Sequence, residues 1–247
     1  MKKNIIEVCA ASVQSALNAQ KAGAHRVELC GGLEIGGITP SSATIIQTKA
    51  LLDIDVFVLI RPRGGDFCYS VLEIETIKED IIFCKENKID GVVIGMLEKD
   101  GTVNLPQLKE LVELAAPMQV TFHRAFDRAA DPLLALEKII DAGAHRILTS
   151  GQKATAYEGR FLLKELVKKS NNRITILAGA GINRQNILNI ARVSKTNEFH
   201  LSGKSIVKSP MNIEDSTVQF SQNDMSENDY FETDVKKIRA VVELMNK

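Results

Sequence analysis

The chain has 247 residues, of which 45% are hydrophobic and 25% charged, which is the balance of a folded protein and excludes disorder as the dominant state. Its 31 lysine and arginine residues equal its 31 aspartate and glutamate residues, so the positive field that nucleic-acid binding requires is missing. Glu7 follows only two apolar residues, too few for a signal-peptide core, and no later run approaches a membrane span, so we expect a cytoplasmic protein without a nucleic-acid or membrane partner.

Short apolar runs rich in valine and isoleucine recur along the chain, each followed by turn residues and then by a segment of helical period. In chain order, the predicted strands cover residues 5–8, 26–30, 56–61, 91–95, 119–123, 146–149, 174–178 and 198–201. This alternation predicts an α/β protein, either a closed (β/α)8 TIM-type barrel or an open, doubly wound sheet. Eight similar units without a dinucleotide-binding fingerprint favour the closed barrel, a fold of roughly 250 residues.

The segments between the strands carry helix-start signals, which satisfy the free amides of a first helical turn. These signals are Ser12, Pro40-Ser41, Ser70, Pro106, Asp131-Pro132 and Asn183. One junction occurs twice, because residues 22–26 and 142–146 share the sequence Ala-Gly-Ala-His-Arg. Each copy joins a helix end to a strand start, the face of a barrel that serves stability, so we interpret His25 and His145 as structural.

After the eighth strand the chain changes character. Residues 209–228 are polar and poor in pattern, and a last helix is expected from about 234 to 245. The prediction is therefore a single domain, with the barrel over about 1–205 and a polar loop and terminal helix over about 206–247.

Polar residues at the carboxyl ends of the strands are the candidates for chemistry, because a barrel of this kind builds its site there. Glu7 and Glu28 lie at the ends of the first two strands and could hold a metal, relay a proton or pair with Arg61. His123 ends the fifth strand, and it could be a general base or a metal ligand that the nearby carboxylate of Asp127 orients.

An anion site is also predicted. The segment 61–66 places Arg61 and Arg63 in one glycine-containing loop, which suits a phosphate or carboxylate. Glycine-rich turns follow the seventh and eighth strands, and the amides of such turns form the usual phosphate cradle of a barrel. The residues predicted there are Gly179, Gly181, Ser202 and Gly203, with His200 just before them on the eighth strand. Alternatively, these glycines only allow tight turns.

Four cysteines lie far apart without a Cys-x-x-Cys pair, so they form neither a zinc ribbon nor a thioredoxin motif and should be free thiols in a reducing cytosol. Two of them, Cys9 and Cys30, each follow a glutamate by two residues on the first two strands, which are neighbours in a barrel. Two close thiolates suit copper(I), a soft ion that accepts few sulfur ligands. The alternative is that each is a small buried hydrophobic residue.

Five segments in the same order resemble the CutC family. They are residues 7–9, 27–30 with 36–41, 60–67, 121–127 and 148–152, and the resemblance runs from residue 1 to about 205. It implies a TIM-type barrel in the cytoplasm, a homodimer or larger homo-oligomer, and a role in copper homeostasis. It also implies copper(I) as the ligand of Cys9 and Cys30, and a polar barrel mouth of Glu7, Glu28, Arg61, Arg63, Asp66, His123 and Ser150. The chain departs from the family pattern at residues 178–181, where a third glycine is common, and this weakens the phosphate-cradle interpretation.

Three functions stay open at this point. The first is copper(I) binding or trafficking through the two cysteines. The second is an enzyme for a small phosphorylated or carboxylated metabolite, in which the two arginines hold the anion and His123 is the acid or base beside Glu7 or Glu28. The third is an oligomeric scaffold whose segment 209–228 meets a partner protein.

Overall fold

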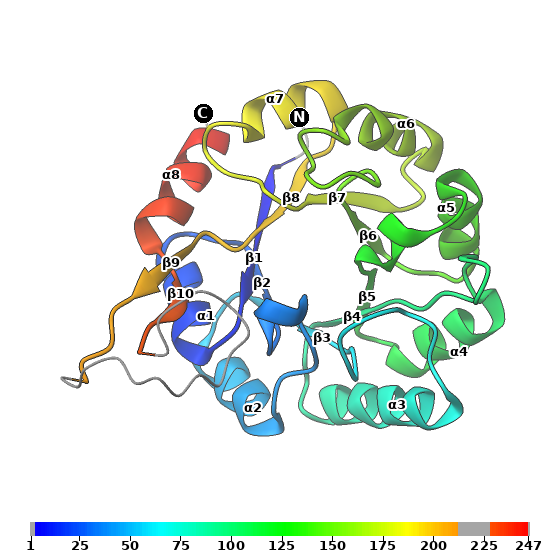
Figure 1. The fold of residues 1–247 in the computed structure, drawn as a ribbon, viewed down its shortest axis with the longest axis horizontal. Helices are drawn as coiled ribbons and strands as arrows, with labels where there is room; N and C mark the ends of the chain where they lie inside the picture. Colours follow the sequence, from blue (N-terminus) through cyan, green and yellow to red (C-terminus); the bar gives the residue numbers. More distant parts are fainter. Residues whose placement is uncertain (1–2, 212–227, 247) are drawn as a thin grey trace.

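The computed structural model describes residues 3–211 and 228–246, and its core is a closed barrel of eight parallel strands (Figure 1). Consecutive strands pair with one another, and β1 closes the ring by pairing with β8. The strands are β1 (Ile5–Ala10), β2 (Arg26–Leu29), β3 (Asp55–Leu59), β4 (Gly91–Ile94), β5 (Gln119–Phe122), β6 (Arg146–Thr149), β7 (Thr175–Gly179) and β8 (Glu198–Leu201). The predicted (β/α)8 barrel is confirmed, and each of these strands overlaps its predicted range.

A ring of helices surrounds the barrel in Figure 1. The helices are α1 (Val13–Lys21), α2 (Ser42–Leu51), α3 (Val71–Glu86), α4 (Leu105–Ala115), α5 (Pro132–Asp141), α6 (Arg160–Ser170), α7 (Ile187–Ser194) and α8 (Val235–Met245), with short 3-10 turns η1 (Leu33–Ile35) and η2 (Arg124–Arg128). Among the described residues, no helix combines the length and hydrophobicity that crossing a membrane requires.

Most of the predicted helix starts are confirmed. The hydroxyl oxygens of Ser12, Ser41 and Ser70 accept amide hydrogen bonds at the starts of α1, α2 and α3, and such caps contribute about 1 kcal/mol each. Asn183 is the exception, because α7 begins only after Asn186. The side chains of these two asparagines bond to amides of the intervening turn, which delays the helix.

Side chains alternate along the strands between the surrounding helices and the barrel interior. On β1, Ile6, Val8 and Ala10 belong to the main hydrophobic core, which the helices cover. Glu7 and Cys9 point the other way, into the barrel. A separate, smaller apolar cluster fills part of this interior, and it consists of Cys9, Cys30, Phe57, Leu59 and Val93. The interior also contains charged and polar side chains beside apolar ones such as Leu148, so the polar site lies inside the barrel.

The two copies of the repeated junction make the same contact. His25 Nδ1 accepts a hydrogen bond from the Ile6 amide at 3.1 Å, and His145 Nδ1 accepts one from the Val120 amide at 3.0 Å. Each ring therefore satisfies an amide of the neighbouring strand at the amino end of the barrel. The structural interpretation of both histidines is confirmed.

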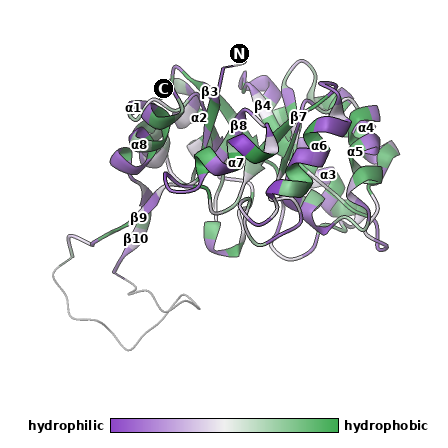
Figure 2. Ribbon diagram, turned by 90° about the horizontal axis from the view of Figure 1, so that it is seen from above, coloured by the Kyte–Doolittle hydropathy of each residue, from purple (hydrophilic) through white to green (hydrophobic). Residues whose placement is uncertain are grey.

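Beyond β8 the structure differs from the predicted polar loop. Lys204–Val207 (β9) and Tyr230–Thr233 (β10) pair antiparallel and extend away from the barrel near α8 (Figure 2). These two segments lie outside the regular alternation of strand and helix that identified the barrel strands. Residues 212–227, the middle of the predicted loop, lie outside the described residues. The predicted terminal helix is present as α8, with Asp234 capping its first turn.

Candidate functional site

A cavity of about 270 Å³ lies at the carboxyl ends of the strands, the face on which TIM-type barrels carry their sites. Its polar lining residues are Cys9, Glu28, Arg61, His123, Arg124, His200 and Ser202. Its apolar lining includes Leu59, Phe67, Leu148, Ile182 and Leu201. Most of the residues expected to carry chemistry are therefore brought to one cavity.

Toward the amino ends of the strands, two buried arginines lie among carboxylates inside the barrel. Arg26 Nε donates to Glu7 Oε2, and Arg26 Nη2 lies 2.8 Å from Glu198 Oε2. Arg146 Nε donates to the same oxygen of Glu198 at 3.0 Å. Burial opposes ionisation of Glu7, but the charge of Arg26 and the contact with His200 lower the pKa of Glu7 to about 2. Glu7 is thus an ionised carboxylate whose two oxygens are held by Arg26 and His200.

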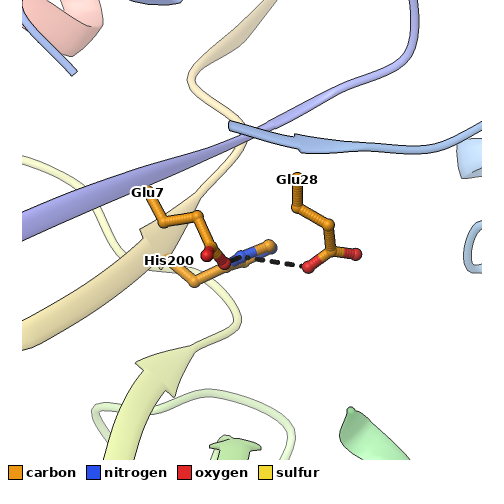
Figure 3. Close-up of side chains that lie close together, drawn as sticks. All are labelled: Glu7, Glu28 and His200. Atoms are coloured by element: carbon orange, nitrogen blue, oxygen red, sulfur yellow. Dashed lines mark hydrogen bonds and ion pairs between the residues drawn. The ribbon is translucent and has the colours of Figure 1, made fainter. Parts of the chain in front are cut away.

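Glu7, Glu28 and His200 lie together on β1, β2 and β8 (Figure 3). His200 Nδ1 is 2.7 Å from Glu7 Oε1 and 3.5 Å from Glu28 Oε2. Burial raises the pKa of Glu28 to about 7, against the opposing effect of His200. Burial alone would lower the pKa of His200, but the Glu28 charge, the Cys9 thiol and Glu7 raise it well above its ordinary value. His200 is therefore a cation between two acidic groups.

This group of three residues could also hold a metal ion. One ligand atom from each residue lies within 4.8 Å of the others. Carboxylate oxygens and an imidazole suit a divalent ion better than copper(I), and the ion would have to replace the proton of His200. The expected proximity of Glu7 and Glu28 is met, and His200 completes the group.

Cys9 and Cys30 are also brought together, as their matching positions on neighbouring strands predict. Both are free thiols, and their sulfurs are 3.4 Å apart. Cys9 is 8% exposed and lines the cavity, whereas Cys30 is 1% exposed and is not part of the lining. The hydrogen bond with Cys30 and burial raise the pKa of Cys9 well above its ordinary value. The Cys9 sulfur is thus a protonated thiol facing the cavity.

His123 directly follows β5, and its buried ring lines the cavity wall. Its Nδ1 accepts a hydrogen bond from the Ala125 amide at 3.1 Å, so the proton of the neutral ring is on Nε2. Burial and the positive charge of Arg61 lower the pKa of His123 to about 3, so near neutral pH the ring is a neutral donor rather than a base. Asp127 does not orient this ring, because its carboxylate accepts hydrogen bonds from Ser150 instead.

Arg61 and Arg63, predicted to hold an anion together, point to different places. Arg61 lines the cavity, and its Nη1 and Nη2 donate to three backbone carbonyl oxygens. Its Nε is buried and has no hydrogen-bond partner in the described part of the chain. Arg63 lies outside the cavity lining, with its guanidinium engaged by Glu73, Asp66 and backbone carbonyl oxygens of its own loop. Of these two arginines, Arg61 is therefore the one that is placed at the cavity.

The predicted phosphate cradle is largely filled by the chain itself. Gly181 and Ser202 line the cavity, but Gly179 and Gly203 do not. Before α7, asparagine side chains accept hydrogen bonds from the backbone amides of residues 183 and 185. At the start of α8, the Asp234 carboxylate accepts hydrogen bonds from the backbone amides of residues 236 and 237. Gly203 has a φ of +53°, a backbone conformation that favours glycine, and a Cβ atom there would also press on the end of the Ile238 side chain of α8.

Arg26 is not among the predicted site residues, and His200 is placed on the eighth strand without being linked to Glu7. Arg26 takes the place expected for Arg61 as the partner of Glu7. Both residues follow from the register of the closed barrel, which pairs Glu7 with Arg26 across β1 and β2 and with His200 across β1 and β8. Closure of the predicted strands and a two-residue period would have identified them.

Comparisons with known proteins agree on one family. The CutC family matches residues 4–205. A CutC family protein of Parabacteroides distasonis is 46% identical over 97% of this chain and 100% of its own length. The copper homeostasis protein cutC homolog of Homo sapiens is 43% identical over 96% of this chain and 87% of its own. The crystal structure of CutC from Streptococcus agalactiae superposes with a TM-score of 0.77 at 32% identity, covering 81% of this chain and 98% of that one.

Proposed function

This chain belongs to the CutC family, and we propose that it takes part in copper homeostasis by binding one copper(I) ion through Cys9 and Cys30. The observation that carries the proposal is the pair of free thiols, whose sulfurs are 3.4 Å apart beside the barrel cavity. The human relative bears the name copper homeostasis protein, and we extend that role to this chain.

The donor atoms fit a soft ion. Copper(I) prefers sulfur ligands and accepts few of them. Bonds of about 2.3 Å from both sulfurs, at their present separation of 3.4 Å, would meet at an angle of about 95°. A trigonal arrangement requires the sulfurs to separate by only roughly 0.6 Å more. His200 contacts the Cys9 thiol and can supply a third ligand once it has lost its proton.

The proposal also includes the cytoplasmic location, where thiols stay reduced, and assembly into a homodimer or larger homo-oligomer. Light scattering of the purified protein gives its mass in solution and tests the assembly. The mass of a single chain would contradict this part of the proposal.

Titration of the reduced protein with copper(I) against a competing chelator, in the absence of oxygen, tests the copper assignment. We expect the parent to bind one equivalent and the Cys9→Ser, Cys30→Ser double variant to lose that binding. Cys68→Ser is the matched control, because Cys68 is also a free thiol but does not line the cavity. Circular dichroism of each variant separates a lost ligand from a lost fold. Copper binding by the double variant as tight as that of the parent would contradict the assignment.

A further inference from the structure

Two residues that line the cavity each carry a buried hydrogen-bond donor without an acceptor in the described part of the chain. Arg61 Nε and His123 Nε2 are buried and have no hydrogen-bond partner among residues 3–211 and 228–246. Arg61 is 6% exposed and His123 is 4% exposed, and both line the same cavity. A buried donor without an acceptor is costly, so two of them on one cavity wall indicate a ligand that supplies acceptors.

Both side chains contact the same aromatic ring, Phe67, and their other polar atoms are fixed by the backbone. The Phe67 ring centroid is 5.0 Å from the His123 ring centroid and 5.0 Å from Arg61 Cζ. Backbone carbonyl oxygens bind the Nη1 and Nη2 groups of Arg61, and the Tyr69 hydroxyl lies near the guanidinium, but Nε itself has no hydrogen-bond partner in the described part of the chain. The Ala125 amide binds His123 Nδ1, which leaves the proton on Nε2. Both donor atoms are covered in this structure, so a ligand that binds them must displace the side chains that cover them.

We propose that this wall binds the carboxylate of a small organic acid, with one oxygen accepting from Arg61 Nε and the other from His123 Nε2. This site goes beyond the copper function and does not depend on it. At these two donors the single guanidinium charge of Arg61 matches one carboxylate, and the neutral imidazole adds a donor without adding charge. The other cations of the lining already have acidic partners, since Arg124 pairs with Asp127 and His200 lies between Glu7 and Glu28. A phosphate dianion has more oxygens than these two donors satisfy, and side chains already occupy the amides before α7 and at the start of α8.

The rest of the cavity indicates what else the acid carries. Glu28 Oε2 is buried in the same lining and has no hydrogen-bond partner in the described chain. A hydroxyl or ammonium group on the ligand would donate to this oxygen. The apolar side chains of Leu148, Ile182 and Leu201 also line the cavity. A cavity of about 270 Å³ with these walls suits a hydroxy- or aminocarboxylate of a few carbon atoms.

Calorimetric titration of the copper-free protein with lactate, alanine and inorganic phosphate tests this proposal. We expect saturable binding of lactate or alanine, and which of the two binds identifies the group that meets Glu28. Phosphate is expected to bind more weakly than either. The proposal is overturned if neither carboxylate binds, or if phosphate binds as tightly as the better one. Because no copper is present, the result is independent of whether Cys9 and Cys30 bind copper.

His123→Phe keeps a ring of similar shape but removes the Nε2 donor, so carboxylate affinity should fall roughly tenfold or more. Arg63→Gln is the control, because it removes a nearby charge that lies outside the cavity lining, and its affinity should match that of the parent. Equal affinity in His123→Phe and the parent would overturn the proposal. If His123→Phe does not fold, the parent protein provides the test. The proposal then requires the nuclear magnetic resonance signal of the His123 Nε2 proton to shift when the carboxylate is added. An unchanged signal would overturn it equally.

Discussion

Glu7 Oε1 and His200 Nδ1 lie 2.7 Å apart across the seam where β1 pairs with β8, although 193 residues separate them in the chain. The other carboxylate oxygen of Glu7 accepts from Arg26. Glu28 also lies near His200, so basic and acidic groups alternate from Arg26 through Glu7 and His200 to Glu28. This alternation allows four ionisable groups to be buried inside one barrel.

Arg26 compensates two buried carboxylates, so its removal should be costly. Arg26→Met leaves Glu7 and Glu198 without this partner, and we expect the free energy of unfolding to fall by roughly 3–5 kcal/mol. Urea unfolding at neutral pH measures the change. Arg173→Met is the matched control, because Arg173 pairs with the exposed Glu137, and there we expect no measurable loss. Similar losses in both variants would show that the buried network has no special role.

Glu28→Gln should change how stability depends on pH. The folded protein holds the Glu28 proton more tightly than the unfolded chain, because its pKa is raised from 4.5 to about 7. The free energy of unfolding of the parent should therefore fall as the pH rises from 4.5 to about 7, by at most roughly 3 kcal/mol. The free energy of unfolding of the variant should not show this fall. Unfolding free energies at several pH values give the difference between the two proteins. Curves that stay parallel across the window would contradict the buried, proton-binding role of Glu28.

The repeated histidines should contribute equally and independently to stability. His25→Leu and His145→Leu each leave a strand amide without its acceptor, and we expect each to cost roughly 1 kcal/mol. The rings lie at the starts of β2 and β6, far apart in the barrel, so the double variant should lose the sum. Thermal and urea unfolding of the two single variants and the double variant measure these losses. A loss of stability in the double variant that differs strongly from the sum of the two single losses would mean that the two junctions are energetically coupled.

Copper affinity should rise with pH. Burial and the hydrogen bond with Cys30 raise the pKa of the Cys9 thiol, so this thiol gives up a proton when it binds the ion. For each proton released, the apparent copper affinity rises about tenfold per pH unit, as long as the pH is below the pKa of the thiol. Competition titrations at two pH values one unit apart on the acidic side of neutrality measure this slope. Affinity that does not change with pH would argue against thiol ligands.

The barrel and part of the site were predictable from local sequence signals. Apolar strand runs, serine caps such as Ser70, and the order of the units predict the eight strands and the ring of helices. The proximity of Cys9 and Cys30 follows as well, because consecutive strands pair in a barrel and both residues stand two positions after a glutamate. These features depend on period and chain order alone.

Other features depend on how the chain folds in space. Arg61 and Arg63 are two residues apart and chemically alike, yet one meets backbone carbonyls beside the cavity and the other meets Glu73 on α3. The path of their loop decides this, and no local pattern encodes it. The contact of His200 with Glu7 exists only because the last strand closes on the first. The β9–β10 pair likewise joins two four-residue segments across a long separation.

X-ray absorption spectroscopy at the copper edge, on reduced protein loaded with one equivalent of copper(I), tests the central claim most directly, because it identifies the atoms bound to the ion. We expect two sulfur ligands at about 2.3 Å in the parent and in Cys68→Ser, and their loss in the Cys9→Ser, Cys30→Ser variant. A parent spectrum with only nitrogen or oxygen ligands, or the same sulfur signal in the double variant, would contradict copper binding at the cysteine pair.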